Sequence, residues 1–136
     1  MKEWIARIAF SAVFAINVIC ALQFIFDPMA YIGAYQLTGT GAQAAIQGYG
    51  VVFLMWNATY PLFIWKPSSH RMLGIIILVQ QLIGCIGETI ILFSLPSAGA
   101  ELLHSSILRF IAFDAGGFVV MLIGYIVLFS RRGNAG

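Results

Sequence analysis

The last apolar segment of this chain is the feature that most constrains its fold. Residues 102–129 are long enough to cross a bilayer as a helix, because about 20 residues at ~1.5 Å each cover a hydrocarbon core of ~30 Å. The segment nevertheless contains a cation and an anion, Arg109 and Asp114. An ionisable group at membrane depth costs roughly 2.5 kcal/mol or more unless it is paired or hydrated. The rest of the chain is therefore expected to satisfy these two side chains.

Three further segments, residues 4–26, 41–65 and 72–95, have the same apolar character. The chain is 61% hydrophobic and 9% charged, whereas soluble domains carry about 25% charged residues. We therefore predict an all-α integral membrane protein, an antiparallel four-helix bundle that forms a single transmembrane domain over residues 1–136. A soluble helical bundle with an unusually large core is less favoured. No small-residue cleavage site follows the first segment, so we interpret it as a retained span rather than a signal peptide.

The connection between the first two segments, residues 28–40, is aromatic and contains no charged residue. Tyr31 and Tyr35 suit the membrane interface, where one end of each ring can stay hydrated. We predict a short interfacial or re-entrant element here. Within the second segment Pro61 lacks a backbone N–H, which predicts a kink near the far end of that helix.

The positive residues predict the orientation in the membrane. They flank the segments at the N-terminus, the second connection and the C-terminus, and the first and third connections contain no Lys or Arg. The flanking cations are Lys2, Arg7, Lys66, Arg71, Arg131 and Arg132. The positive-inside rule then places both termini in the cytoplasm, and we expect the cell inner membrane.

Glu88 in the third segment and Arg109 in the fourth are predicted to pair in the outer half of the bundle. Each lies ~10 Å below the outer end of its helix, and helices joined by a short loop usually pack as antiparallel neighbours. Asp114 lies about five residues deeper and points about 140° away from Arg109, at ~100° per residue. It therefore needs another partner. The candidates at that depth are the amides of Gln81, Asn17 and Asn57.

These side chains together predict a polar cavity in the outer leaflet that binds a small or amphipathic ligand or a lipid. The predicted ligand-binding residues are Glu88, Arg109, Asp114, Gln81, Gln47, Gln43, Gln23, Asn17 and Tyr49. The alternative is structural: an ion pair and hydrogen-bonded amides that fix helix register, at ~0.6 kcal/mol per contact. The number of polar groups at similar depth favours a site, because one or two contacts suffice for register.

Two other functions remain open. A small proton-coupled transporter would use Glu88 and Asp114 as protonation sites, but it needs a path to both faces, and the cytoplasmic half offers few polar groups. An accessory or structural subunit would dock on a partner through the glycines of the fourth segment, Gly116 and Gly117. The expected partners are membrane lipid, a small amphipathic ligand, and further copies or subunits of a membrane complex.

No catalytic, metal or cofactor site is predicted. Cys20 and Cys85 form no Cys-x-x-Cys pair of the kind that thiol–disulfide exchange requires. His70 and His104 flank opposite ends of the third segment, so they cannot share a haem iron. No nucleophile–base arrangement is visible, which makes an enzyme the least favoured class. A net charge of +2 without a basic cluster argues against nucleic acid as a partner.

Overall fold

A computed structural model describes residues 1–130, which form α-helices and short 3₁₀ helices without any β-strand. The long helices are α1 (Lys2–Phe26), α3 (Gly39–Trp56), α5 (Arg71–Ser94) and α6 (Glu101–Phe129). Between them lie α2 (Met29–Ile32), η1 (Gly33–Tyr35), η2 (Asn57–Thr59) and α4 (Tyr60–Trp65). The all-α prediction is confirmed. The flanking cations predicted at Arg131 and Arg132 lie outside the described residues.

Three of these helices, α1, α5 and α6, are each long and apolar enough to cross a membrane. Their ends lie within two residues of the predicted spans. Large apolar side chains on their outer faces, such as Ile8, Ile83 and Ile123, are more than half exposed. Apolar surface on this scale is typical of contact with lipid rather than water. The helices therefore have the character of a membrane protein.

The predicted span at residues 41–65 is not one helix, so a bundle of four continuous helices is not confirmed. The 3₁₀ turn η2 divides it into α3 and α4. Pro61 is at the start of α4, where its missing N–H costs little. The side-chain Nδ2 of Asn57 donates a hydrogen bond to the Phe53 carbonyl at 2.8 Å and so occupies an acceptor at the end of α3. The kink expected from Pro61 therefore lies just before it.

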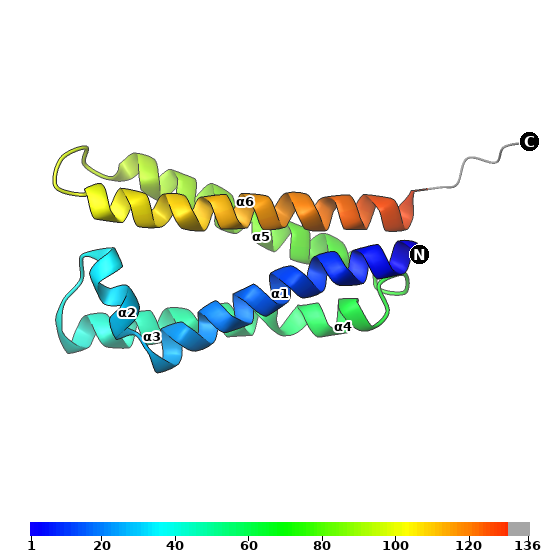
Figure 1. The fold of residues 1–136 in the computed structure, drawn as a ribbon, viewed down its shortest axis with the longest axis horizontal. Helices are drawn as coiled ribbons and strands as arrows, with labels where there is room; N and C mark the ends of the chain where they lie inside the picture. The colour runs from blue at the N-terminus through cyan, green and yellow to red at the C-terminus, as the bar shows by residue number, and fades with distance from the viewer. Residues whose placement is uncertain (131–136) are drawn as a thin grey trace, which may run out of the picture.

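Helix α1 is at the centre of the packing. It lies against α3 and α6, whereas α5 packs chiefly against α6 (Figure 1). Close approach depends on glycine: a Cβ at Gly50 of α3 would lie 2.7 Å from the Ala21 carbonyl oxygen of α1, and one at Gly124 of α6 would lie 3.0 Å from Ala9. Gly116 of α6 is exposed and meets nothing within 4 Å.

Two apolar clusters fill the bundle. One contains Ala9, Phe10, Val13, Tyr60, Phe63, Ile77, Leu78 and Met121. The other contains Phe24, Ile32, Ala42 and Ile46, with Cys20, Tyr31, Tyr35, Phe53 and Phe110 packed against it. We call the second set the outer aromatic cluster. Along α1 the first set ends at Val13 and the second begins at Cys20, so Asn17 lies between the two.

The predicted element between the first two segments is the short helical stretch formed by α2 and η1. It folds back at the end of the bundle opposite the N-terminus (Figure 1). The Tyr31 hydroxyl donates to the side chain of Gln23 on α1. Gln36 follows η1 with a φ of 54° and donates through Nε2 to the Gly99 carbonyl at 3.1 Å. The first bond ties α2 to α1, and the second joins the first and third connections at this end of the molecule.

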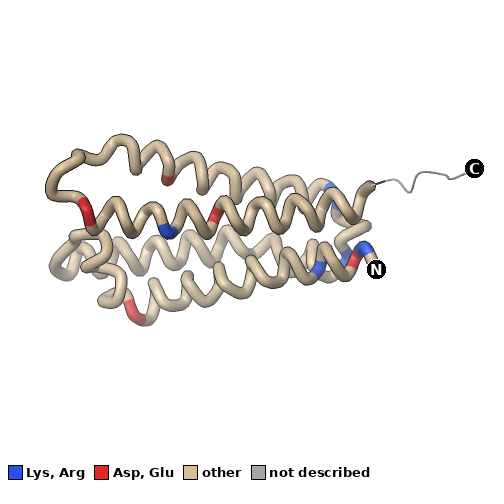
Figure 2. The backbone as a smooth tube through the Cα atoms, turned by 45° about the horizontal axis from the view of Figure 1, so that its top comes forward, with Lys and Arg blue, Asp and Glu red and all other residues tan. Residues whose placement is uncertain are grey.

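Most of the described Lys and Arg residues gather at the end that carries the N-terminus (Figure 2). Contacts between the helix ends agree with this view. The Lys2 ammonium donates to the Ser130 carbonyl at 2.7 Å, and Arg7 donates to the Trp65 carbonyl at 2.9 Å. The other end of the bundle, formed by the first and third connections, carries no described Lys or Arg.

Candidate functional site

Gln81 on α5 links α6 and α4 through its side-chain amide. Its Nε2 donates to Asp114 Oδ1 on α6 at 2.8 Å, and its Oε1 accepts from the Tyr60 hydroxyl on α4 at 3.4 Å. Gln81 and Tyr60 are both buried. A buried polar group is costly unless it is hydrogen-bonded. Gln81 is thus the partner that Asp114 was predicted to need.

The other two predicted amides pair with each other. Asn17 Nδ2 on α1 donates to Asn57 Oδ1 at 3.1 Å, and both side chains are buried. Because Asn57 also donates to the Phe53 carbonyl, the pair holds α1 against the break between α3 and α4. These bonds satisfy the Asn57 side chain and the Asn17 amino group, whereas Asn17 Oδ1 is buried without a partner among the described residues.

Asp114 approaches α5 closely at Gly84. A Cβ added at Gly84 would lie 2.8 Å from Asp114 Oδ2 and 3.5 Å from the Trp56 indole of α3. Glycine therefore leaves room for both side chains. The neighbouring Gly87 has no atom within 4 Å of its Cβ position.

Glu88 is a half-buried carboxyl one turn beyond Gly84 on α5. Its Oε2 atom is buried and has no hydrogen-bond partner among the described residues. The Asp114 carboxylate lies against Gly84, so both carboxyls belong to the same stretch of the α5–α6 contact. Within residues 1–130 neither carboxylate is within ion-pair distance of a cation. We call Glu88 and Asp114 the acid pair.

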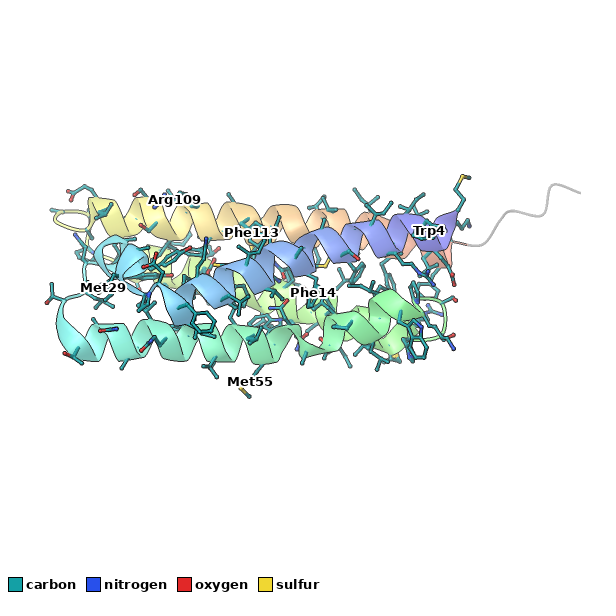
Figure 3. The ribbon with its side chains drawn as sticks, turned by 60° about the horizontal axis from the view of Figure 1, so that its bottom comes forward. Trp4, Phe14, Met29, Met55, Arg109 and Phe113 are labelled. Carbon is teal, nitrogen blue, oxygen red and sulfur yellow. The ribbon has the colours of Figure 1, made fainter. Side chains whose placement is uncertain are left out.

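Arg109 is not part of this arrangement, so the predicted ion pair with Glu88 is wrong. The Arg109 side chain is exposed, donates to Ser106 Oγ at 3.3 Å, and lies at the outer edge of α6 (Figure 3). Among the described residues the one ion pair is Glu3–Arg7, at 3.7 Å. The physical reason is the rotation of α6: Phe110 faces inward, with its ring 6.2 Å from that of Phe24. The adjacent Arg109 is thereby turned outward.

The four predicted residues nearer the outer end do not line a common cavity. Gln23 accepts the Tyr31 hydroxyl, and Gln47 donates to the Ile25 carbonyl of α1 at 3.0 Å, so both act as ties between elements. Gln43 is half-buried, and Tyr49 is 65% exposed on the outside of α3. The contacts of Gln23 and Gln47 each satisfy a polar side chain within the bundle.

The volume expected to form the outer-leaflet cavity is occupied by the outer aromatic cluster. The rings of Tyr35 and Phe110 stack with centroids 6.2 Å apart, and Phe24 meets Tyr31 edge to face at 4.5 Å. Two open grooves lie elsewhere: one of about 540 Å³ between α1 and α4, and one of about 420 Å³ lined by residues of α3 and α5.

Three further titratable side chains lie on elements packed around the acid pair, and none of them was predicted as a site residue. Tyr60 donates to Gln81, and Cys20 and Tyr35 belong to the outer aromatic cluster. Burial raises the pKa of the Tyr35 phenol, and the nearby Glu88 carboxylate raises it further. The Tyr35 phenol is thus expected to be neutral near pH 7. The spacing of Cys20 three residues after Asn17 on α1 was the one available signal.

Comparison of the chain with protein-family models, curated proteins and solved structures finds no match. In the part of the chain that the structure describes, no three His, Cys, Asp or Glu residues come together in a group that could hold a metal ion. What the site does offer is two carboxyls, a hydrogen-bonded amide and neutral neighbours at membrane depth.

Proposed function

We propose that this chain is a membrane protein with four spans, in which α3, η2 and α4 together form the second span. Helices α3 and α4 contribute 18 and six residues and follow one another along the bundle (Figure 1). At ~1.5 Å per residue this is enough to cross a hydrocarbon core of ~30 Å. The gathered Lys and Arg residues support the expected orientation, with both termini in the cytoplasm and the protein in the inner membrane.

We further propose that the acid pair binds and releases protons, and that this is the centre of the protein's function. The observation that carries the proposal is the buried, unpartnered Oε2 of Glu88, one turn along α5 from Gly84, where the Asp114 carboxylate lies. Two negative charges close together in a low-dielectric region repel each other, and no described cation neutralises them. Protonation of one carboxyl removes the repulsion and supplies a donor. Ionisable groups at membrane depth usually mark functional sites.

The surroundings favour proton binding from one side of the membrane over transport across it. From Asp114 a hydrogen-bonded chain leads through Gln81 to Tyr60. Beyond Tyr60 the apolar cluster of Phe10, Phe63 and Ile77, all fully buried, closes the way to the basic end of the bundle. The acid pair thus lacks a polar route to that face, which argues against the proton-coupled transporter. The expected ligand pocket between Glu88 and Arg109 loses its basis, because Arg109 is turned outward.

Trp56 offers an internal reporter, since its indole and the Asp114 carboxylate both lie against Gly84. In a Trp4→Phe/Trp65→Phe background, the fluorescence of Trp56 is recorded as a function of pH in lipid nanodiscs. We expect a pH-dependent step that is altered by Glu88→Gln and lost in Asp114→Asn. The control is Glu101→Gln, which removes an exposed carboxyl at the start of α6 and should leave the step unchanged. A step that persists in the double variant Glu88→Gln/Asp114→Asn would contradict the proposal.

A further inference from the structure

A groove of about 540 Å³ lies between α1 and α4, at the basic end of the bundle. Its walls are mainly apolar and include Trp4, Ile8, Ala12, Ile64 and Trp65. Trp4 stands at the very start of α1 (Figure 3), and Trp65 ends α4. Tryptophan at helix ends is typical of the depth at which lipid headgroups meet hydrocarbon. The groove therefore runs from headgroup depth into the apolar region.

Arg7 supplies the charge of the groove. Its guanidinium donates to the Trp65 carbonyl at 2.9 Å and lies 5.4 Å from the Trp4 ring. Its Nε is buried without a hydrogen-bond partner among residues 1–130, and 31% of the side chain remains exposed. The Glu3 carboxylate lies 3.7 Å away and partly neutralises it. Lys66, whose ammonium is 4.5 Å from the Trp65 ring, adds a second positive charge at this end.

We propose that this groove binds one anionic phospholipid, with the phosphate at Arg7 and an acyl chain along Ile8, Ala12 and Ile64. The proposal follows from charge complementarity: a partly exposed guanidinium stands at the end of a mainly apolar groove. Arg matches phosphate geometry with two parallel donors, and each basic residue near an anionic lipid surface contributes about 1 kcal/mol. The groove is separate from the acid pair, so this inference does not depend on the proposed function.

Native mass spectrometry of the purified full chain in detergent tests the proposal. The probes are dioleoylphosphatidylglycerol, dioleoylphosphatidylcholine with the same chains, and glycerol phosphate, which has the anionic group without chains. We expect one phosphatidylglycerol to bind about fivefold tighter than phosphatidylcholine, and glycerol phosphate not to compete. Equal affinity for the two lipids would overturn the proposal. Competition by glycerol phosphate would overturn it too, because it would identify a site for free phosphate.

Variants separate a lipid site from general attraction to charge. Arg7→Gln should abolish the roughly fivefold preference, which corresponds to about 1 kcal/mol. Glu3→Gln should strengthen phosphatidylglycerol binding, because it removes the carboxylate that competes for Arg7. Ala12→Trp should block the acyl-chain path without disturbing the core, since Ala12 is exposed.

Two matched controls lie outside the groove. Arg71→Gln removes another exposed basic residue at the same end, on α5, and Ala112→Trp adds a large side chain on an exposed position of α6. Neither should change the lipid preference. If Arg7→Gln and Arg71→Gln lower the preference for phosphatidylglycerol equally, the result would contradict a specific site. A further result would overturn the proposal: the chain forms a dimer that Ala12→Trp abolishes, while the affinity for lipid is the same in Ala12→Trp and in the wild-type chain. The groove would then bind a second copy of the chain.

Discussion

Gln81 on α5 donates a hydrogen bond of 2.8 Å to the carboxylate of Asp114 on α6. Because Gln81 is buried and the surroundings are apolar, either side chain left alone has no water to replace its partner. We therefore expect Gln81→Leu and Asp114→Leu each to lower the free energy of unfolding by about 1–3 kcal/mol. The double variant should lose less than the sum of the two. Reversible unfolding in mixed micelles measures this cycle, and strictly additive losses would contradict a direct contact.

Two glycines on α3 form a matched pair of positions. A Cβ at Gly50 would lie 2.7 Å from the Ala21 carbonyl oxygen, which belongs to the backbone of α1 and cannot move easily. A Cβ at Gly48 would meet nothing within 4 Å. Gly50→Ala should therefore destabilise the protein by about 1–3 kcal/mol through overpacking. Gly48→Ala should stabilise it by up to about 1 kcal/mol through helix propensity. The midpoint of thermal unfolding distinguishes them, and similar shifts for both would contradict the α1–α3 packing.

Arg109 is exposed and has only Ser106 as a side-chain partner among the described residues. Its replacement should therefore be tolerated: Arg109→Leu is expected to change the free energy of unfolding by no more than about 0.5 kcal/mol. Unfolding of the purified variant measures the effect. As a contrast, Arg7→Leu removes a hydrogen bond to the Trp65 carbonyl and the ion pair with Glu3, so it should lower the free energy of unfolding more than Arg109→Leu does. A loss of several kcal/mol for Arg109→Leu would mean that it does satisfy a buried acid.

The raised pKa of Tyr35 predicts a loss of stability at high pH. Folding favours the neutral phenol, so Tyr35 contributes to the free energy of unfolding. This contribution is fully present below the ordinary tyrosine pKa of 10 and is lost as the pH rises through the higher pKa of the folded state. Unfolding measured above pH 10 should therefore show a steeper fall in stability for the wild-type chain than for Tyr35→Phe. The absorbance of tyrosinate follows the same ionisation. An unchanged slope in Tyr35→Phe would contradict burial of this ring.

Hydropathy and charge predicted the helices well, because both report directly on contact with lipid. The ends of α1, α5 and α6 follow from the length of apolar sequence and the residues that flank it. The interruption at η2 was less accessible. Pro61 indicated a kink, but its place depends on the side chain of Asn57, which bonds both to Phe53 and across to Asn17 on another helix. Contacts between distant segments of this kind are not visible as a local pattern.

The candidate site was predicted in part for a related reason. Helical periodicity correctly separated Arg109 from Asp114 on α6, and depth gave three candidate amides for Asp114, of which Gln81 is the one that bonds to it. Periodicity does not, however, determine which face of a helix is turned inward. On α6 that choice is made by Gly124 against Ala9 and by Phe110 in the outer aromatic cluster. The same rotation turned Arg109 outward and left Glu88 beside a second carboxyl instead of a cation.

The most direct test of the central claim is an infrared pH titration of the carboxyl groups in nanodiscs. A coupled pair gives up its protons in two linked steps rather than as independent sites. Carbonyl bands of protonated carboxyls should appear and be removed in turn by Glu88→Gln and Asp114→Asn, and each substitution should shift the titration of the remaining group. Arg109→Leu should leave both bands unchanged. Two bands that titrate independently of each other, or that respond to Arg109→Leu, would contradict the acid pair.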